Sequence, residues 1–80
     1  MIVEVRIPLF SSDFEFDLNE EVMICDLKNE ILETVCQKQH LDYDANNNTV
    51  LLHLQSKTIL NNYQTLIQAD VKKGDTLIIV

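Results

Sequence analysis

The sequence predicts an α+β domain in which one sheet packs against one long helix. Two segments near the start alternate apolar and polar residues, as half-buried strands do. A segment with helical period follows, and short apolar segments close the chain. Strands, then a helix, then strands is an α+β order, and the helix has to cover the apolar face of the sheet.

Length and charge limit what the chain can be. Its 80 residues suffice for one domain with a modest core, so residues 1–80 are expected to form a single domain. Asp and Glu outnumber Lys and Arg by 13 to 6, which leaves a formal net charge of −7. A surface of this sign repels phosphate, which argues against nucleic acid and anionic lipid as partners. No apolar run has the length of a membrane span, and no signal peptide is recognisable, so we expect a cytoplasmic protein.

The first half of the chain contains two strands and the helix. Ile2–Ile7 alternates as a strand does, and Pro8 ends it. In residues 13–18, Phe and Leu alternate with Asp and Glu, and the short connection predicts a hairpin. A helix is predicted at about residues 23–40, where apolar residues recur at three- and four-residue spacing. Met23 is a poor residue to cap it.

The helix carries an acidic stripe and two cysteines. Asp26, Glu30 and Glu33 lie on its polar side, and the simplest interpretation is a solvated helix face. The alternative is a docking face for a basic partner. Cys25 and Cys36 are ~16 Å apart along a helix axis, too far for a disulfide within one chain. Free thiols suit a reducing compartment.

The second half reads as a polar loop at residues 42–48 followed by short apolar segments. Strands are predicted at residues 50–54 and 76–80, with a further short apolar piece at 58–60. One helical turn is predicted at residues 63–69. The sequence Lys-Lys-Gly-Asp before the last strand predicts a turn.

The chain resembles ubiquitin over nearly its whole length. MIVEVRI is similar to the first strand of ubiquitin, and VMICDLKNEI is similar to the start of its helix. TVLLHLQSKTIL and TLIQADVKKGDTLIIV are similar to its later strands, with Leu66 and Val71 as apolar anchors. The resemblance implies the ubiquitin-like β-grasp fold, with a mixed sheet of four to five strands packed on one main helix.

A narrower family also fits: the small bacterial ubiquitin-like proteins of type VII secretion loci, known as YukD or EsaB. They are similar in length, have a similarly long helix, and close with a Gly-Asp turn and an apolar strand, as in residues 73–80. The resemblance implies a non-enzymatic, cytoplasmic interaction module that is an accessory or regulatory component of the secretion system. It implies as partners a membrane-embedded FtsK-like ATPase or other membrane components of that system.

Ubiquitin continues past its last strand into a flexible tail ending in Gly-Gly, whose carboxylate is joined to lysine. Here Val80 falls within the last predicted strand, so conjugation to targets is not expected. A sulfur-carrier or modifier protein of the β-grasp superfamily stays an alternative, which a longer natural chain would revive.

A metal-binding or redox protein is the second alternative. Cys36 and His40 are four residues apart, so one helix face can offer both as ligands, with Cys25 or His53 as a further ligand. The simpler interpretation places Cys36 in the core and His40 at the helix end, where a cation suits the dipole. We therefore predict no metal, no cofactor and no catalytic residue.

Residues 42–53 imitate a calcium-binding loop. Asn47 stands where such a loop needs glycine, and His53 stands where it needs glutamate, so a polar loop is predicted instead. The imitated ligand positions are Asp42, Asp44, Asn46 and Asn48.

The third and last strands are apolar on both sides, which suggests a surface for partners. We expect Val50, Leu52, Leu54, Leu77 and Ile79 to point inward. The predicted outward patch then consists of Leu51, His53, Ile78 and Val80. This surface corresponds to the one through which ubiquitin binds its receptors, with His53 and Val80 matching two positions of it. Such a patch can also pair two copies of the chain as a homodimer.

Overall fold

The computed structural model of the chain describes residues 1–40 and 49–80, and the calcium-like ligand positions lie outside these ranges. Within these two ranges, seven elements follow one another. They are β1 (Ile2–Ile7), the 3₁₀ helix η1 (Pro8–Phe10), β2 (Ser12–Asp17), α1 (Ile24–Lys38), β3 (Leu51–His53), β4 (Thr58–Ile59) and β5 (Thr76–Ile79).

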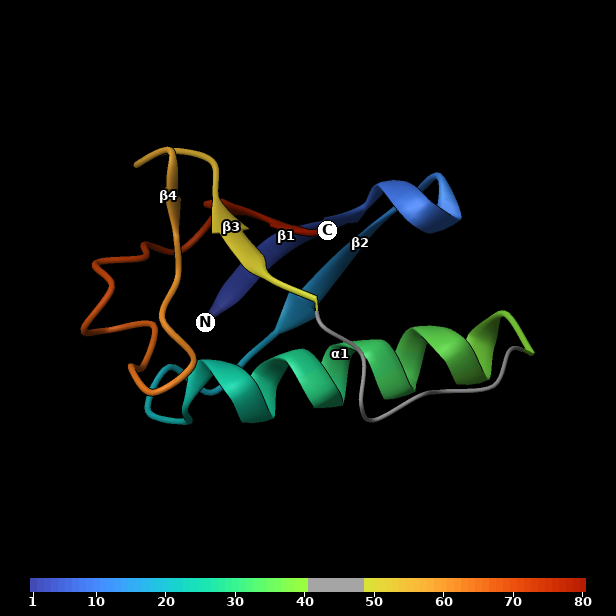
Figure 1. The fold of residues 1–80 in the computed structure, drawn as a ribbon, viewed down its shortest axis with the longest axis horizontal. Coiled ribbons are helices and arrows are strands. Elements are labelled where there is room, and N and C mark those ends of the chain that lie inside the picture. The colour runs from blue at the N-terminus through green and yellow to red at the C-terminus, as the bar shows by residue number, and fades with distance from the viewer. Residues whose placement is uncertain (41–48) are drawn as a thin grey trace.

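The strands form one mixed five-stranded sheet in the order β2-β1-β5-β3-β4, and α1 lies across one face of it (Figure 1). β1 and β5 pair in parallel at the centre, and the other neighbours are antiparallel. This is the predicted α+β architecture, with the β-grasp order of elements. The predicted strands and the helix are confirmed, with ends shifted by one or two residues.

The core lies between the sheet and α1. Alternate residues of β1 are buried, as the pattern predicts, and so are the apolar anchors Leu66 and Val71. Cys36 is buried, as the core interpretation requires. The core cluster comprises Val3, Val5, Ile7, Leu18, Ile24, Leu27, Ile31, Leu32, Val35, Leu51, Leu60, Leu66, Val71, Leu77 and Ile79.

The start of α1 has no side-chain cap, as Met23 led us to expect. Its first amides are satisfied from elsewhere: the N–H of Ile24 donates to the carbonyl of Gln64 at 2.8 Å, and that of Cys25 donates to the carbonyl of Asn62 at 3.0 Å. An unsatisfied buried helix end would be costly, so these two bonds hold the segment before β5 against the helix.

The one helical turn predicted at residues 63–69 is present at its end: the N–H of Ala69 donates to the carbonyl of Thr65, four residues back, at 3.0 Å. It does not continue into a helix, and turns occupy the rest of the segment. Side chains bond the backbone amides locally: Gln64 accepts from the N–H of Asn61, and Gln68 accepts from the N–H of Thr65. The N–H of Gln68 also donates to the hydroxyl of Thr65 at 3.2 Å, so these two residues form a capping box at the start of the single turn.

The Lys-Lys-Gly-Asp turn positions β5 beside β1. The N–H of Asp75 donates to the carbonyl of Lys72 at 3.0 Å, and Gly74 has a φ of 86°. The N–H of Gly74 donates to the carbonyl of Ile2 at 2.8 Å, and the N–H of Glu4 donates to the carbonyl of Asp75 at 3.0 Å. The turn therefore sets the parallel register of the two central strands.

We predict that Gly74→Ala lowers the free energy of unfolding by about 1 kcal/mol, because a side chain disfavours positive φ. The cost comes from the backbone alone, since a Cβ at Gly74 would meet no atom within 4 Å. Gly74→Asn should cost less, and exposed Lys73→Ala should cost little. Urea unfolding measures all three, and equal stability of Gly74→Ala and wild type would contradict the prediction.

Candidate functional site

The orientation of β3 differs from the prediction. Leu51 and His53 are 0% and 3% exposed, whereas Val50 and Leu54 are 37% and 38% exposed. The prediction that Leu51 and His53 point outward is therefore wrong. Its counterpart, that Val50, Leu52 and Leu54 point inward, is wrong for the same reason.

Strand pairing gives the physical reason. β3 is antiparallel to β5, with Leu51 opposite Ile79 and His53 opposite Leu77. Opposite residues on paired strands project to the same face of a sheet. Leu77 and Ile79 point inward, as predicted, so their partners on β3 also point inward.

The side of the sheet away from α1 is lined by aliphatic side chains from three strands and their ends. Leu52 lies opposite Ile78 of β5 on one side and opposite Ile59 of β4 on the other. Val50 and Val80 form a two-way backbone pair, with N–H to carbonyl distances of 2.9 and 3.1 Å. We call this surface the outer apolar face: Val50, Leu52, Leu54, Ile59, Ile78 and Val80.

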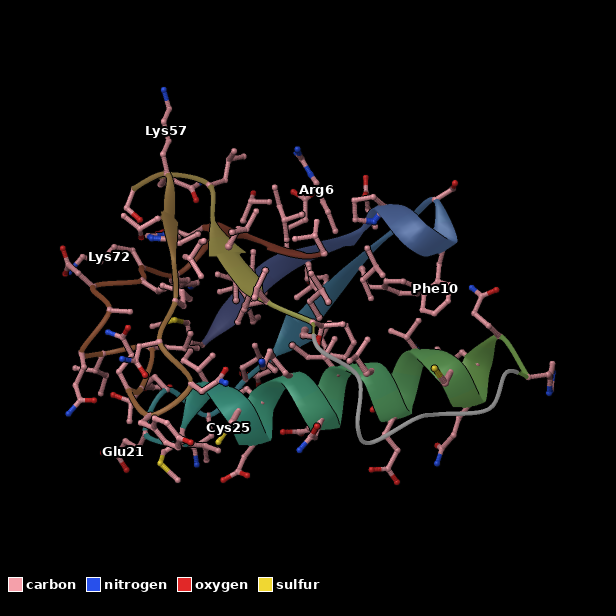
Figure 2. The ribbon with its side chains drawn as sticks, viewed as in Figure 1. Arg6, Phe10, Glu21, Cys25, Lys57 and Lys72 are labelled. Atoms are coloured by element: carbon pink, nitrogen blue, oxygen red, sulfur yellow. The ribbon has the colours of Figure 1, made fainter. Side chains whose placement is uncertain are left out.

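The outer apolar face is open to solvent at its margins. Ile59 is 67% exposed and Val80 is 55% exposed, while Leu52 and Ile78 at the centre are half-buried. Ile78 also lies opposite Arg6 of β1. Figure 2 shows Arg6 on the side of the sheet away from α1 and Phe10 on the side toward it. Of the predicted patch, Ile78 and Val80 thus belong to this face, and their role in binding stays a prediction.

Buried His53 is the centre of a chain of polar side chains that reaches the surface at Ser56 and Thr58. Its Nε2 lies 2.7 Å from Oδ2 of Asp75, and its Nδ1 lies 2.8 Å from Oγ of Ser56. The Ser56 hydroxyl lies 2.7 Å from the hydroxyl of Thr58. An ionised carboxylate only accepts, so Nε2 donates to Asp75; in the neutral ring, Nδ1 then accepts from Ser56.

Asp75 is held ionised by its surroundings. The backbone N–H of Lys72 donates to its Oδ2 at 2.9 Å, which lowers the pKa of the carboxyl group. Burial raises the pKa, but its effect is smaller than that of the Lys72 bond. The hydrogen bond from His53 lowers the pKa further. Hydrogen bonds to the charged form favour that form.

A serine, a histidine and an aspartate joined by hydrogen bonds are the residue types of the catalytic triad of serine hydrolases. Such an enzyme needs donors for an oxyanion. In the α/β-hydrolases, the amide after the serine is one of them. Here the N–H of Lys57 already donates to the carbonyl of His53 at 2.8 Å. We therefore interpret the chain as a link between the turn after β3 and the turn before β5. An open hollow of about 280 Å³ beside it is lined by His53, Gln55, Ser56, Ala69, Asp70, Lys72 and Asp75.

The other predicted residues lie apart from this face. Asp26, Glu30 and Glu33 are exposed on α1, as a solvated stripe requires, and their docking role stays a prediction. Cys25 and Cys36 are free thiols, and His40 is exposed. Within the described ranges, no group of three or more His, Cys, Asp or Glu side chains is placed to hold a metal ion.

The structure also places an unpredicted buried cation. Lys28 is only 8% exposed, and its Nζ donates to the carbonyl of Thr49 at 2.9 Å. Within the part of the chain that is described, no helix has the length and apolar character to cross a membrane.

Comparison with known proteins identifies the fold. No family model matches the chain, and no curated protein matches it. Among solved structures, it is similar to the solution structure of the N-terminal ubiquitin-like domain in the 4931431F19Rik protein. The TM-score is 0.71 at 24% sequence identity, over 100% of this chain and 72% of the other. The chain therefore has the ubiquitin-like β-grasp fold.

Asp75 should give the protein a specific sensitivity to acid. Because its pKa is lowered in the folded state from an ordinary value of 3.8, its contribution to stability is complete above that value. The contribution is lost as the pH falls through the lower folded pKa. The difference in unfolding free energy between wild type and Asp75→Asn should thus be steady near pH 5 and shrink below about pH 4. A difference that stays constant down to pH 2 would contradict this assignment.

Proposed function

We propose that the chain is a non-enzymatic protein-interaction module that binds its partner through the outer apolar face. The observation that carries the proposal is a row of side chains across four strands, in which Arg6, Ile78, Leu52 and Ile59 are successive neighbours. Isolated surface aliphatics are normal, but a contiguous apolar patch rimmed by polar residues is typical of a protein interface. The ubiquitin-like fold supports the proposal, because a scaffold of this kind presents one open sheet face.

The proposed partner has a complementary surface, apolar at its centre and basic around it. The half-buried Leu52 and Ile78 would form the centre of the interface, with Ile59 and Val80 as the more exposed contacts around them. The net charge of −7 favours basic residues at the partner's rim. Arg6, beside Ile78, is already paired with Glu4 at 3.0 Å, so these two residues add little net charge to the rim of the face.

The acidic stripe of α1 belongs to a different surface. α1 covers the face of the sheet opposite the outer apolar face, so one flat partner cannot contact both (Figure 1). If the stripe also binds, it binds a second protein or a second segment that wraps around the domain.

We further propose that the module is a cytoplasmic accessory or regulatory component of a type VII secretion system. Support comes from the resemblance to the YukD and EsaB proteins, including the closing Gly-Asp turn and apolar strand. The partner would be a membrane-embedded FtsK-like ATPase or another membrane component of that system. The proposed binding is non-covalent, and intact-protein mass measurement in cells tests the modifier alternative.

Replacing Ile59 and Val80 together by Glu should abolish partner binding, because two charges would be desolvated in an apolar contact. Both side chains are more than half exposed, so the melting temperature should change little. A pull-down from cytoplasm and solubilised membrane, with wild type beside the double variant, measures recovery of the secretion ATPase and of the other membrane components.

Ile67→Glu is the matched control, since Ile67 is 56% exposed and is not part of the outer apolar face. It should bind as wild type does. Equal recovery by wild type and the double variant would exclude the outer apolar face as the contact. Dimerisation of wild type but not of the double variant would assign the face to a second copy instead.

A further inference from the structure

The sheet has two edges, and they differ in length. β4 closes one edge with two residues, whereas β2 closes the other with six. All six residues of β2 are in regular antiparallel register with β1, without a proline or a bulge. A long, regular edge strand is a template on which a further strand can pair. β4 is too short to serve in this way.

The backbone groups at the free side of β2 can be assigned. The N–H of Leu18 donates to the carbonyl of Met1 at 2.8 Å, so Leu18 and Met1 are a hydrogen-bonded pair. In an antiparallel ladder such pairs alternate with pairs that lack hydrogen bonds, so every second residue of β2 before Leu18 bonds to β1. Phe14 and Phe16 therefore bond toward β1, and Asp13, Glu15 and Asp17 direct their N–H and carbonyl groups outward. Within the described ranges, no backbone group pairs with these three residues.

The same three residues carry carboxylates, and few cations of the chain lie near them: Asp13 is opposite Arg6, which is itself paired with Glu4 at 3.0 Å. Asp17 pairs with the amino group of Met1 at 2.9 Å. Among the described residues, Asp13 and Glu15 form no ion pair. Glu15 also lies directly opposite Glu4 in a pair without mutual hydrogen bonds, where side chains come closest. Because Arg6 is already paired with Glu4, it leaves the carboxylate of Glu15 without a cation, and an external cation would be attracted to this position.

The two sides of β2 present different chemistry to an added strand. On the side away from α1, the added strand would meet the carboxylates of Asp13, Glu15 and Asp17. On the side toward α1, it would meet Phe14 and Phe16, which are partly buried against the core with ring centroids 6.2 Å apart. A strand that alternates basic and apolar residues fits both sides at once.

We propose that the edge of β2 is a second binding site, which adds an extended basic–apolar peptide segment of another protein as a sixth strand. Main-chain hydrogen bonds to Asp13, Glu15 and Asp17 supply the affinity, and the alternating side chains supply the selection. This site lies on a different surface from the outer apolar face and does not depend on it.

A second copy of this chain does not fit the site. Pairing β2 with β2 would place the carboxylates of the two copies on the same side of the joint sheet. Charges of one sign on an edge strand oppose such self-pairing. The same charges attract a strand that carries Lys or Arg at alternate positions.

The test uses acetyl-Lys-Val-Lys-Val-Lys-Val-amide and the control acetyl-Lys-Lys-Lys-Val-Val-Val-amide, which has the same composition and charge. Amide hydrogen exchange by NMR provides a residue-level measurement. In the free protein, the amides of Asp13, Glu15 and Asp17 should exchange fast, whereas those of Phe14 and Phe16 are protected by β1. The alternating peptide should protect the first three amides, and the control peptide should not.

Glu15→Pro isolates the backbone contribution. Its N–H points outward, so proline removes an edge donor without breaking the ladder to β1. The affinity for the alternating peptide should fall by about tenfold or more. Glu15→Gln keeps the N–H, so it should lose only the part of the affinity that depends on salt concentration. If Glu15→Pro fails to fold, Glu15→Lys must weaken binding by a similar factor. Unchanged affinity in the variants, no protection of the three amides, or protection only on the outer apolar face would overturn the proposal.

Discussion

Asp75 ties together the three central strands, and the rest of the structure depends on where it holds them. Its backbone carbonyl accepts from the N–H of Glu4 in β1, and its carboxylate accepts from the N–H of Lys72 in the preceding turn. The same carboxylate accepts from the buried ring of His53 at the end of β3. One residue thus fixes the start of β5 against both of its neighbours. A slip of one residue would move every side chain of β3 or β5 to the opposite face.

This register decides which residues are available to partners. With His53 drawn inward to Asp75, Leu52 is placed outward between Ile78 and Ile59. A ring that is 3% exposed can stay in the interior because both of its nitrogens have hydrogen-bond partners. The outer apolar face and the polar chain beneath it are therefore two sides of the same strand pairing. The edge of β2 is set independently, by the hairpin with β1.

The sequence was informative where polar and apolar residues alternate. β1, β2 and α1 each carry a clear period, so their positions and buried sides could be predicted. β3 could not be oriented in this way, because Val50 to Leu54 contains four aliphatics and one histidine and so lacks a polar side. The signal that resolves it is pairing: Leu77 and Ile79 point inward, and they lie opposite His53 and Leu51. Bonds between distant residues, such as Lys28 to Thr49, leave no local pattern at all.

The inward orientation of His53 is the central claim, and its reactivity toward diethyl pyrocarbonate tests it most directly. The reagent modifies accessible imidazole nitrogens, and exposed His40 is an internal control in the same chain. The account predicts rapid modification of His40 in the folded protein, with His53 modified only as fast as the protein unfolds. In urea, both should react. Equal reaction of the two histidines in the folded protein would place His53 on the surface and contradict the register from which the outer apolar face is derived.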